Sequence, residues 1–521
     1  MFSTVTSGAV CGITSYLMQV ETDVSNGLPM FNMVGLLSTE VREAAERVRV
    51  ALRNTGIELP PKHITVNFSP ADIRKKGVGV DLPVALGILA ALGEIDADAL
   101  RKTLVVGELG LDGEVKRVAG ILPVVKKARE EGYETCLLPA ECVREGAVID
   151  GMRIVGVGSL SETIAYLQPM DQGERDRLIA PFTMDRTALF QETSAKTKED
   201  FSDINGQRAV RRAVEVAAAG FHHLLMIGAP GAGKSMIAKR IPTILPDLTE
   251  EEALEVSTIY SVAGLMKPGE ALITKRPFVA PHHTITQTAL SGGGHIPQPG
   301  AISLAHRGVL FLDEIAEFPH TTLDIMRQPL EDRNVRIARA SGTYTYPADF
   351  MLVGALNPCP CGYYPDRGRC RCTDKEIDRY LSHLSGPILD RMDLCVEAPR
   401  VDVRELEGEP RDNESSAEIR TRILRARERQ RQRFRGTQLR FNADMGVAEI
   451  RKYCRVGQRE KSLLEQIFYK MDLSARAYHR LIKVARTIAD LDDSDEIRQN
   501  HITEASCYRL ADAKYWRRNR E

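Results

Sequence analysis

The alternation of hydrophobic and polar positions first separates an amino-terminal region, residues 1–168, from the rest of the chain. Here short β-rich runs such as KHITVNFS (62–69) alternate with runs of helical periodicity such as VDLPVALGILAALGEI (80–95). The region is therefore expected to fold as an α/β or α+β domain. Residues 169–200 are polar and only weakly periodic, and this pattern predicts a linker.

A different pattern follows in residues 201–400. Short, largely apolar strands alternate there with helical segments: HLLMIG (223–228), GVLFLD (308–313) and DFMLVGALN (349–357). Strands that are apolar on both faces are typical of a parallel sheet covered by helices on both sides. Residues 401–440 are Arg-rich and are expected to form a helical connector, and residues 441–521 have helical periodicity without strand signals. The predicted fold class is α/β with a helical carboxyl-terminal region.

Composition narrows the classes of function. A chain of 521 residues is long enough for several domains, and its net charge of −1 provides no overall attraction to nucleic acid or membrane. Any DNA-binding surface must therefore be local. The chain has no apolar run of about 18 residues and no signal-peptide pattern at its amino terminus, so we expect a cytoplasmic protein without a membrane partner.

The most specific motif is GAPGAGKS at 228–235, which fits G-x-x-x-x-G-K-[ST] between a strand and a helix. Its glycines permit a tight turn whose N–H groups converge on phosphates, while the lysine adds a positive charge and the serine hydroxyl reaches Mg²⁺. The sequence therefore predicts a site for ATP and Mg²⁺. Its expected members are Gly228, Ala229, Pro230, Gly231, Ala232, Gly233, Lys234, Ser235 and Asp313.

Asp313, Glu314 and Asn357 follow two of the predicted buried strands. Open α/β sheets bind their ligands at the carboxyl ends of the strands, so these side chains are expected beside the phosphates. Asp313 is predicted to hold Mg²⁺, and Glu314 to orient and deprotonate the attacking water. Asn357 could sense the γ-phosphate or fix the attacking water, although an asparagine at this place alone would indicate only a turn. Two further candidates, Arg391 and Arg476, could neutralise charge in the transition state or form ordinary surface ion pairs.

Four cysteines lie within 14 positions, as Cys359-Pro-Cys361 and Cys370-Arg-Cys372, in an insertion at 358–373. Two close pairs joined by a turn-rich loop can supply the four thiolates of a tetrahedral Zn²⁺ site, although the spacing differs from the commoner C-x₂-C. The alternatives are a redox centre and simple packing. We expect Zn²⁺ to be coordinated by Cys359, Cys361, Cys370 and Cys372.

Two segments could contact DNA. VRIARASGTYTYP (335–347) has the pattern of a β-hairpin, and its Arg336, Arg339, Tyr344 and Tyr346 could meet the backbone and bases of single-stranded DNA. The alternative is a hairpin packed on its own domain. Residues 417–440 hold nine arginines and two glutamates, which could bind phosphates or form a solvated helix face.

These motifs together resemble those of the AAA+ ATPases of the magnesium-chelatase-like class, and within it the YifB/ComM family. The matching stretches are GLPMFNMVGLLSTEVREAAERVR, PHHTITQTALSGGGHIPQPGAISLAHRGVLFLDE, ALNPCPCG and LSGPILDRMD. The resemblance implies an AAA+ core at 201–400, a helical lid at 441–521 and a homo-hexameric ring. It also implies that Arg391 reaches the nucleotide of the neighbouring subunit and that Arg476 is the sensor-2 arginine.

The amino-terminal domain, residues 1–168, resembles a Lon-protease fold in noncatalytic form. Lon-type proteolysis needs a serine nucleophile and a lysine base. The segment similar to the nucleophile helix, KKGVGVDLPVALGIL (75–89), contains no serine, and Leu122 lies near the expected lysine position. We therefore expect no peptidase activity.

The resemblance implies an ATP-driven DNA motor, a helicase of branch migration that acts with recombination proteins on incoming single-stranded or branched DNA. Two other functions remain open. One is a magnesium-chelatase-type motor that inserts metal, and the other is a chaperone-like ATPase that remodels proteins.

Overall fold

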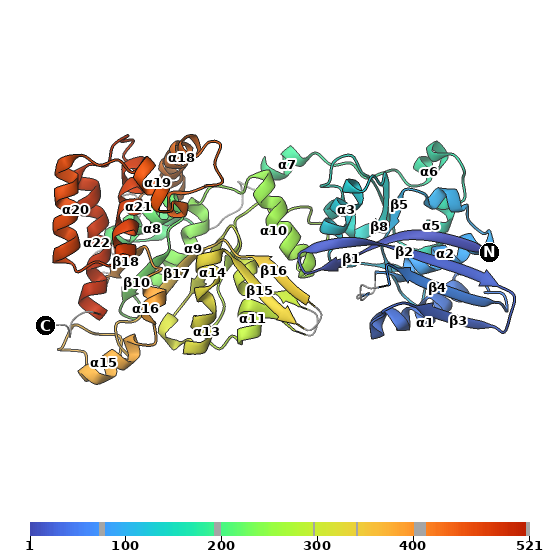
Figure 1. Cartoon of the computed structure of the whole chain (residues 1–521), viewed down its shortest axis with the longest axis horizontal. Coiled ribbons are helices and arrows are strands. Elements are labelled where there is room, and N and C mark those ends of the chain that lie inside the picture. The colour runs from blue at the N-terminus through green and yellow to red at the C-terminus, as the bar shows by residue number, and fades with distance from the viewer. Residues whose placement is uncertain are drawn as a thin grey trace.

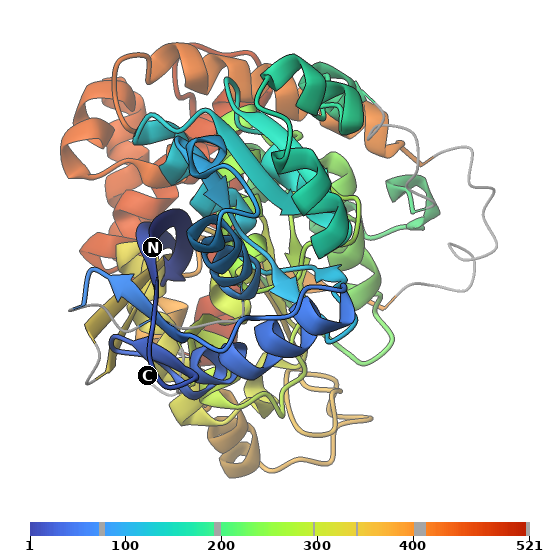
Figure 2. The same ribbon diagram turned by 90° about the vertical axis from the view of Figure 1, so that its right-hand side faces the viewer.

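The computed structural model describes residues 1–71, 75, 79–191, 199–294, 297–339, 342–400 and 413–516. The molecule is elongated, with the amino-terminal domain at one end, a central α/β domain and a group of carboxyl-terminal helices at the other end (Figure 1). Viewed from the amino-terminal end, the strands of the first domain lie in front of the central domain (Figure 2).

The amino-terminal domain contains a mixed seven-stranded sheet of order β3-β4-β2-β1-β5-β8-β9. The strands are β1 (Phe2–Cys11), β2 (Thr14–Ser25), β3 (Met30–Val34), β4 (His63–Ser69), β5 (Thr103–Val105), β8 (Thr135–Pro139) and β9 (Arg153–Val157), and β6 (Glu108–Leu109) pairs with β7 (Val115–Lys116). Its helices are α1 (Thr39–Asn54), α2 (Asp81–Leu92), α3 (Ile121–Glu130), α4 (Val143–Gly146) and α5 (Leu160–Leu167). α2 is buried almost all round because it packs on β1 and β2 and also contacts α1.

The predicted linker is partly folded. Residues 169–191 contain α6 (Gln172–Leu178) and α7 (Arg186–Gln191). Asp171 caps α6, Arg175 Nε donates to the carbonyl of Pro169, and the N–H of Phe182 donates to the carbonyl of Ile154 in β9. Local capping and one backbone hydrogen bond therefore attach the start of the predicted linker to the first domain.

The central domain contains the expected parallel sheet. Five strands lie in the order β11-β14-β17-β10-β18, and all neighbours are parallel. They are β10 (Leu224–Gly228), β11 (Phe278–Val279), β14 (Val309–Leu312), β17 (Met351–Leu356) and β18 (Leu394–Ala398). Alternate residues of β10 face two separate cores: Leu224 and Met226 belong to one, Leu225 and Ile227 to the other. Burial on both faces explains why these strands are apolar throughout.

Helices cover both faces of this sheet. They are α8 (Arg208–Gly220), α9 (Lys234–Ile244), α10 (Glu250–Val262), α11 (Gln287–Ser291), α12 (Ala301–Leu304), α13 (His320–Asp324), α14 (Pro329–Asp332), α15 (Asp374–Leu381) and α16 (Gly386–Leu389). Two hairpins accompany them, β12 (Gly292–Gly293) with β13 (Gln298–Pro299) and β15 (Asn334–Arg339) with β16 (Gly342–Pro347).

The carboxyl-terminal region is helical, as predicted. It consists of α18 (Ser416–Arg433), α19 (Val447–Tyr453), α20 (Gln458–Lys470), α21 (Ala475–Leu491) and α22 (Gln499–Trp516). The part of the predicted connector at 401–412 lies outside the described residues. Apolar residues of α18 and α21 share one core with α8 and α9, so these helices are packed on the central domain.

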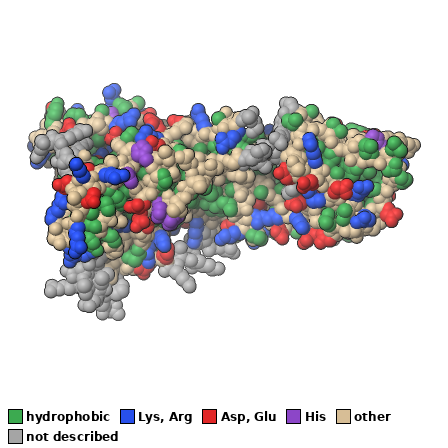
Figure 3. All heavy atoms as spheres, turned by 90° about the horizontal axis from the view of Figure 1, so that it is seen from below, with side chains coloured by type: hydrophobic (Ala, Val, Ile, Leu, Met, Phe, Trp, Pro, Cys, Tyr) green, Lys and Arg blue, Asp and Glu red, His purple; other side chains and the backbone are tan. Residues whose placement is uncertain are grey.

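The surface carries charges of both signs. On the face shown in Figure 3, basic and acidic side chains are interspersed, in keeping with a net charge of −1. None of the helices in the described part of the chain is long and apolar enough to cross a membrane.

Candidate nucleotide site

The GAPGAGKS loop connects β10 to α9, and its backbone requires glycine. A Cβ at Gly228 would lie 2.3 Å from the carbonyl oxygen of Ala398 in β18. Gly231 and Gly233 have φ of +76° and +83°, which only glycine adopts without cost. α9 begins at Lys234, so the positive end of its dipole faces the loop. The loop has the geometry of a phosphate-binding loop.

Two strands and α9 bring polar side chains to this loop: Asp313 follows β14, Asn357 follows β17, and Lys234 and Ser235 begin α9. Lys234 Nζ donates to the carbonyls of Gly228 at 2.5 Å and Ala229 at 3.0 Å, and to Asn357 Oδ1 at 3.1 Å. Ser235 Oγ donates to Asp313 Oδ2 at 2.6 Å. Burial lowers the pKa of Lys234, and the nearby carboxylates of Asp313 and Glu314 oppose that shift. The structure thus brings together the residues predicted for ATP and Mg²⁺.

Glu314 follows Asp313 with a backbone φ of +49°, and its side chain is exposed. Its N–H donates to Asp313 Oδ1 at 3.1 Å. A left-handed non-glycine residue costs free energy and persists where the surroundings require it, which often occurs at functional sites. Here the turn leaves the Glu314 carboxylate in solvent beside the carboxyl end of β14, where it can contact water.

The oxygens of Ser235 and Asp313 fit Mg²⁺, which prefers hard oxygen ligands and retains several of its waters. Their hydrogen bond shows that both side chains point to one place beside the loop. A bound Mg²⁺ would neutralise charge on the phosphates.

Sequence reasoning missed Gln207. Its Nε2 donates to the carbonyl of Ala232 in the loop at 3.1 Å and to that of Pro399, just after β18, at 2.6 Å. Gly206 and Gln207 both have positive φ, at +65° and +52°. The Asn-Gly-Gln run before α8 is a turn signal, and it could have directed attention to this residue.

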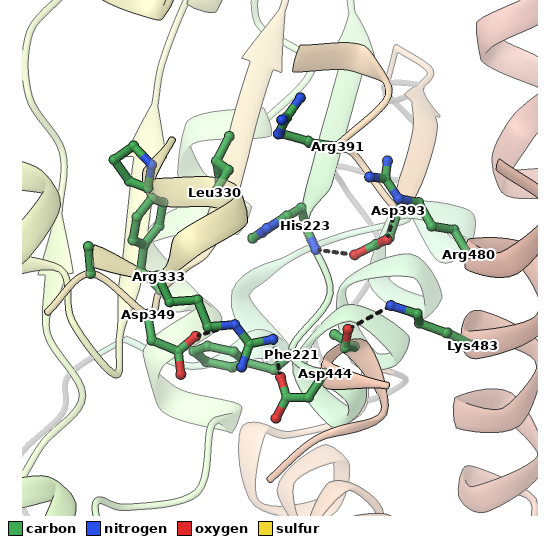
Figure 4. A pocket seen from close by; sticks show the side chains of 14 residues that line it. Phe221, His223, Leu330, Arg333, Asp349, Arg391, Asp393, Asp444, Arg480 and Lys483 are labelled. Carbon is green, nitrogen blue, oxygen red and sulfur yellow. Dashed lines mark hydrogen bonds and ion pairs between the residues drawn. The ribbon is translucent and has the colours of Figure 1, made fainter. Parts of the chain in front are cut away.

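Arg391 lies at the other end of the sheet, in the pocket shown in Figure 4. The pocket includes His223, which immediately precedes β10, whereas the phosphate loop follows that strand. Arg391 donates to Glu331 and, at 2.8 Å, to the carbonyl of Pro387. Because β10 separates the two places, Arg391 is directed away from the nucleotide site of its own subunit.

Helices of the carboxyl-terminal region hold the loop of Arg391. Arg509 Nη1 in α22 and Arg480 Nη1 in α21 donate to the carbonyl of Met392 at 2.8 and 3.4 Å. Arg480 also lies 3.5 Å from the carboxylate of Asp393 (Figure 4). Arg476 is exposed in the first turn of α21, one helical turn before Arg480. Among the described residues, Arg476 makes no hydrogen bond or ion pair with the phosphate loop.

The four predicted metal ligands converge. The sulfurs of Cys359, Cys361, Cys370 and Cys372 all lie within 4.8 Å of one another. The Sγ–Sγ distances are 3.3 Å (Cys359–Cys361), 3.6 Å (Cys361–Cys370) and 3.8 Å (Cys359–Cys370). Bonds of about 2.3 Å from a tetrahedral Zn²⁺ place sulfurs about 3.8 Å apart, so this donor set fits zinc.

Comparison with known proteins identifies the family. Family models for the magnesium chelatase subunit ChlI match residues 200–406, 20–142 and, for its carboxyl-terminal part, 413–509. The chain is 41% identical to the protein YifB of Escherichia coli, over 98% of this chain and 97% of that protein. It is 39% identical to the competence protein ComM of Haemophilus influenzae, over 96% of both. The chain belongs to the YifB/ComM family of magnesium-chelatase-like AAA+ proteins.

The fold class follows from this membership. The central parallel sheet and the helices after it form the AAA+ part of this YifB/ComM protein. A shorter match, 31% identity over 30% of this chain and 32% of the relative, is to Lon protease 2 of Bacillus subtilis. The amino-terminal α/β domain is Lon-like, as expected.

Within that domain, the expected protease positions hold other groups. Asp81 begins α2, within the segment that resembles the nucleophile helix, and its fully buried carboxylate accepts two hydrogen bonds from Arg47, at 2.8 and 2.9 Å. Burial raises the pKa of Asp81, and the ion pair with Arg47 opposes that shift. Leu122 is buried against residues of α10. Both positions have structural roles in this YifB/ComM chain.

The β15–β16 hairpin exists, but two of its four predicted DNA contacts are wrong for this conformation. Tyr346 is 0% exposed and donates from its hydroxyl to the carbonyl of Pro297 at 2.7 Å, and Tyr344 is 9% exposed. Val335 and Ile337 lie opposite these tyrosines in the register, so all four side chains share the face that packs on the domain. Arg336 and Arg339 are exposed, as the prediction requires.

The Arg-rich segment also differs from a free basic surface. Arg422 pairs with Glu215 and Glu414, and Arg433 pairs with Asp490. Arg427 is buried, with its guanidinium 3.9 Å from the centre of the Phe441 ring. Much of the positive charge of α18 is therefore used to attach this helix to its own protein.

Proposed function

We propose that this protein is an ATP-hydrolysing ring motor that moves on DNA and promotes branch migration during recombination of incoming DNA, in the cytoplasm. The observation that supports the proposal is the separation of the candidate residues along the strands of the central sheet. The phosphate loop, Asp313, Glu314 and Asn357 lie at the carboxyl ends of the strands, and Arg391 lies in the pocket before the start of β10. The relative named as a competence protein supports the link to incoming DNA.

The chain's residues have distinct roles in this proposal. The loop amides and Lys234 hold the phosphates of ATP, with Ser235 and Asp313 around Mg²⁺. Glu314 accepts the proton of the attacking water, and Asn357 holds that water or the γ-phosphate. Arg391 of one subunit stabilises negative charge in the site of the next, and Arg476 contributes from α21. A head-to-tail contact repeated around a closed ring, which we take to be a hexamer, satisfies this requirement.

Single-stranded or branched DNA would contact local basic positions. Arg336 and Arg339 on the hairpin are exposed and suit the phosphate backbone. Zn²⁺ held by the four cysteines would act structurally, since four thiolates complete its coordination. The Lon-like domain would serve as a scaffold or a docking platform for recombination proteins.

One alternative has support of its own. The matching family models describe a magnesium chelatase subunit, so a motor that remodels a partner protein to insert metal is the second candidate. A DNA motor predicts that the substrate itself stimulates hydrolysis, whereas a chelatase-type or chaperone-like motor requires a protein partner.

DNA-stimulated ATP hydrolysis separates these functions. The rate of ATP hydrolysis is measured without DNA, with linear duplex and with a branched junction of equal length. Branch migration is followed on gels as the conversion of the junction into its separated duplex products. We expect branched DNA to raise turnover severalfold and ATP to drive strand exchange, with Arg336→Ala/Arg339→Ala reducing both. If DNA does not change the rate of ATP hydrolysis and the protein does not bind DNA, the proposed DNA motor is excluded.

A further inference from the structure

The cysteine insertion touches the phosphate loop directly. Cys359 follows Asn357 by two residues, and the carbonyl of Cys359 accepts from the N–H of Gly362 at 2.9 Å in a tight turn. Gly362 has a φ of +80°, and a Cβ there would lie 2.3 Å from Cδ and 2.7 Å from Cγ of Pro230. The turn from Cys359 to Gly362, which contains the first two cysteines, therefore packs against the ring of a phosphate-loop residue.

A second contact joins the insertion to the far side of that loop. The guanidinium of Arg400 lies 4.9 Å from the centre of the Tyr363 ring. Arg400 follows Pro399 in the chain. The side-chain amide of Gln207 donates both to the carbonyl of Pro399 and to the carbonyl of Ala232 in the phosphate loop. The insertion thus contacts Pro230 and also the segment held by Gln207.

Its remaining side faces the carboxyl-terminal helices. The rings of Tyr364 and Tyr515 in α22 lie 6.1 Å apart in an edge-to-face arrangement. Cys359 and Cys370 are buried in the same core as Ala511 and Tyr515. The insertion is therefore wedged between the phosphate loop and α22.

The folded conformation of the insertion depends on its four cysteine sulfurs. Residues 358–373 contain neither helix nor strand, and Cys361 and Cys372 are only half-buried. The N–H of Tyr364 points to Cys359 Sγ at 3.4 Å, an interaction that suits a thiolate held by a metal. A small polar segment without a core of its own gains its stability from bound metal.

We propose that the metal-bound cysteine insertion supports the phosphate loop through the contact of Gly362 with Pro230, so that ATP affinity depends on metal occupancy. Gly362 is a positioning residue in this arrangement and touches no nucleotide. The inference rests on the zinc site and on the ATP binding of the proposed function.

Three variants of the full-length protein test the contact: Gly362→Ala, Pro230→Ala and the double variant. Zinc per chain is measured by mass spectrometry, and affinity with the fluorescent nucleotide mant-ATP and Mg²⁺. Gly362→Ala pushes a methyl group into Pro230 and is expected to weaken mant-ATP binding about tenfold or more. Pro230→Ala removes the atoms that would clash, so the double variant is expected to bind mant-ATP more tightly than Gly362→Ala and to approach Pro230→Ala, short of the strain that alanine has at a φ of +80°.

Gly368→Ala is the control for an added methyl group within the insertion, and Gly436→Ala is the control for backbone strain, because Gly436 has a φ of +79° and nothing lies within 4 Å of a Cβ placed there. Gly368 belongs to the same insertion, and a Cβ there would meet only the side chain of Asp366, at 3.2 Å. Both variants are expected to bind mant-ATP like the wild type.

Metal removal gives an independent test. Stripping zinc with a chelator should weaken mant-ATP binding about tenfold, and adding zinc back should restore it. Unchanged affinity after stripping, unchanged affinity in Gly362→Ala, or a double variant as weak as Gly362→Ala would each overturn the inference. Wild-type protein without zinc would instead refute the zinc site, and wild-type protein that does not bind mant-ATP would refute the proposed function.

Discussion

Lys234 shows how single residues prepare the site. Its ammonium group is held by two loop carbonyls and by the side chain of Asn357. Burial lowers its pKa, which means that the charged form is poorly solvated where it lies. An incoming phosphate would offer this ammonium a stronger partner than neutral carbonyls do. The lysine also connects the loop to Asn357 through a hydrogen bond.

The roles of Lys234 and Glu314 can be separated by mutation. Glu314→Gln keeps the size of the side chain but removes the proton acceptor, so it should retain mant-ATP binding and lose about 10²-fold or more in turnover. Lys234→Ala should lose nucleotide binding itself. Turnover is measured by phosphate release and binding by fluorescence. A Glu314→Gln variant that hydrolyses ATP at the wild-type rate would show that another residue activates the water.

At the scale of elements, the parallel sheet explains both the success and the limits of sequence reasoning. β10, β14 and β17 were predictable because their burial on both faces requires apolar residues throughout, and the motif residues follow at their carboxyl ends. Gln207 acts from a separate turn, and pattern alone does not show which loop such a side chain reaches.

The errors have a physical cause in each case. The two hairpin tyrosines were expected to face DNA, but period-two alternation places them opposite Val335 and Ile337, on the apolar face. The arginines of α18 were candidates for phosphate binding, but acidic partners distant in sequence, such as Glu215 and Asp490, neutralise several of them. Only the tertiary fold shows that pairing.

The two ends of the sheet lead to a test of subunit cooperation. Lys234→Ala removes the phosphate-binding lysine of a subunit and Arg391→Ala the arginine proposed to act in the neighbouring site, so each protein alone should be inactive. In a one-to-one mixture that forms closed rings, roughly a quarter of the subunit contacts join an intact Lys234 on one side to an intact Arg391 on the other. ATP hydrolysis should therefore partly return. The rate is measured by phosphate release after mixing, with each variant alone as control. No recovery in rings shown to exchange subunits would contradict action of Arg391 in the neighbouring site.

At the scale of the whole molecule, the Lon-like domain and the AAA+ core meet through a buried polar contact. Ser261 Oγ in α10 donates to Glu145 Oε1 at 2.5 Å, and the N–H of Leu122 donates to the same oxygen at 3.1 Å. The N–H of Gly120 donates to the carbonyl of Ser261 at 2.9 Å. Apolar residues around Leu122 and Val256 surround these groups. The interface therefore combines a hydrophobic cluster with one carboxyl group shielded from water.

That carboxyl group makes the stability of the interface depend on pH. Burial raises the pKa of Glu145 above its ordinary value of 4.5, and hydrogen bonds from Ser261 and Leu122 oppose the shift. The folded state thus binds this proton more tightly than the unfolded chain, and the linked stability is complete below pH 4.5 and lost as pH rises through the raised pKa.

Glu145→Gln tests this linkage, because the amide keeps an oxygen for both donors and carries no charge. At pH 8 we expect it to be more stable than the wild type by about 1 kcal/mol, with the difference shrinking as pH falls toward 4.5, the ordinary value for this carboxyl. Thermal unfolding at both pH values measures the effect. Glu141→Gln, which changes an exposed carboxylate four residues earlier, is the control and should follow the wild type. A Glu145→Gln protein less stable than the wild type at pH 8 would show that the ionised carboxylate strengthens the contact between the two domains.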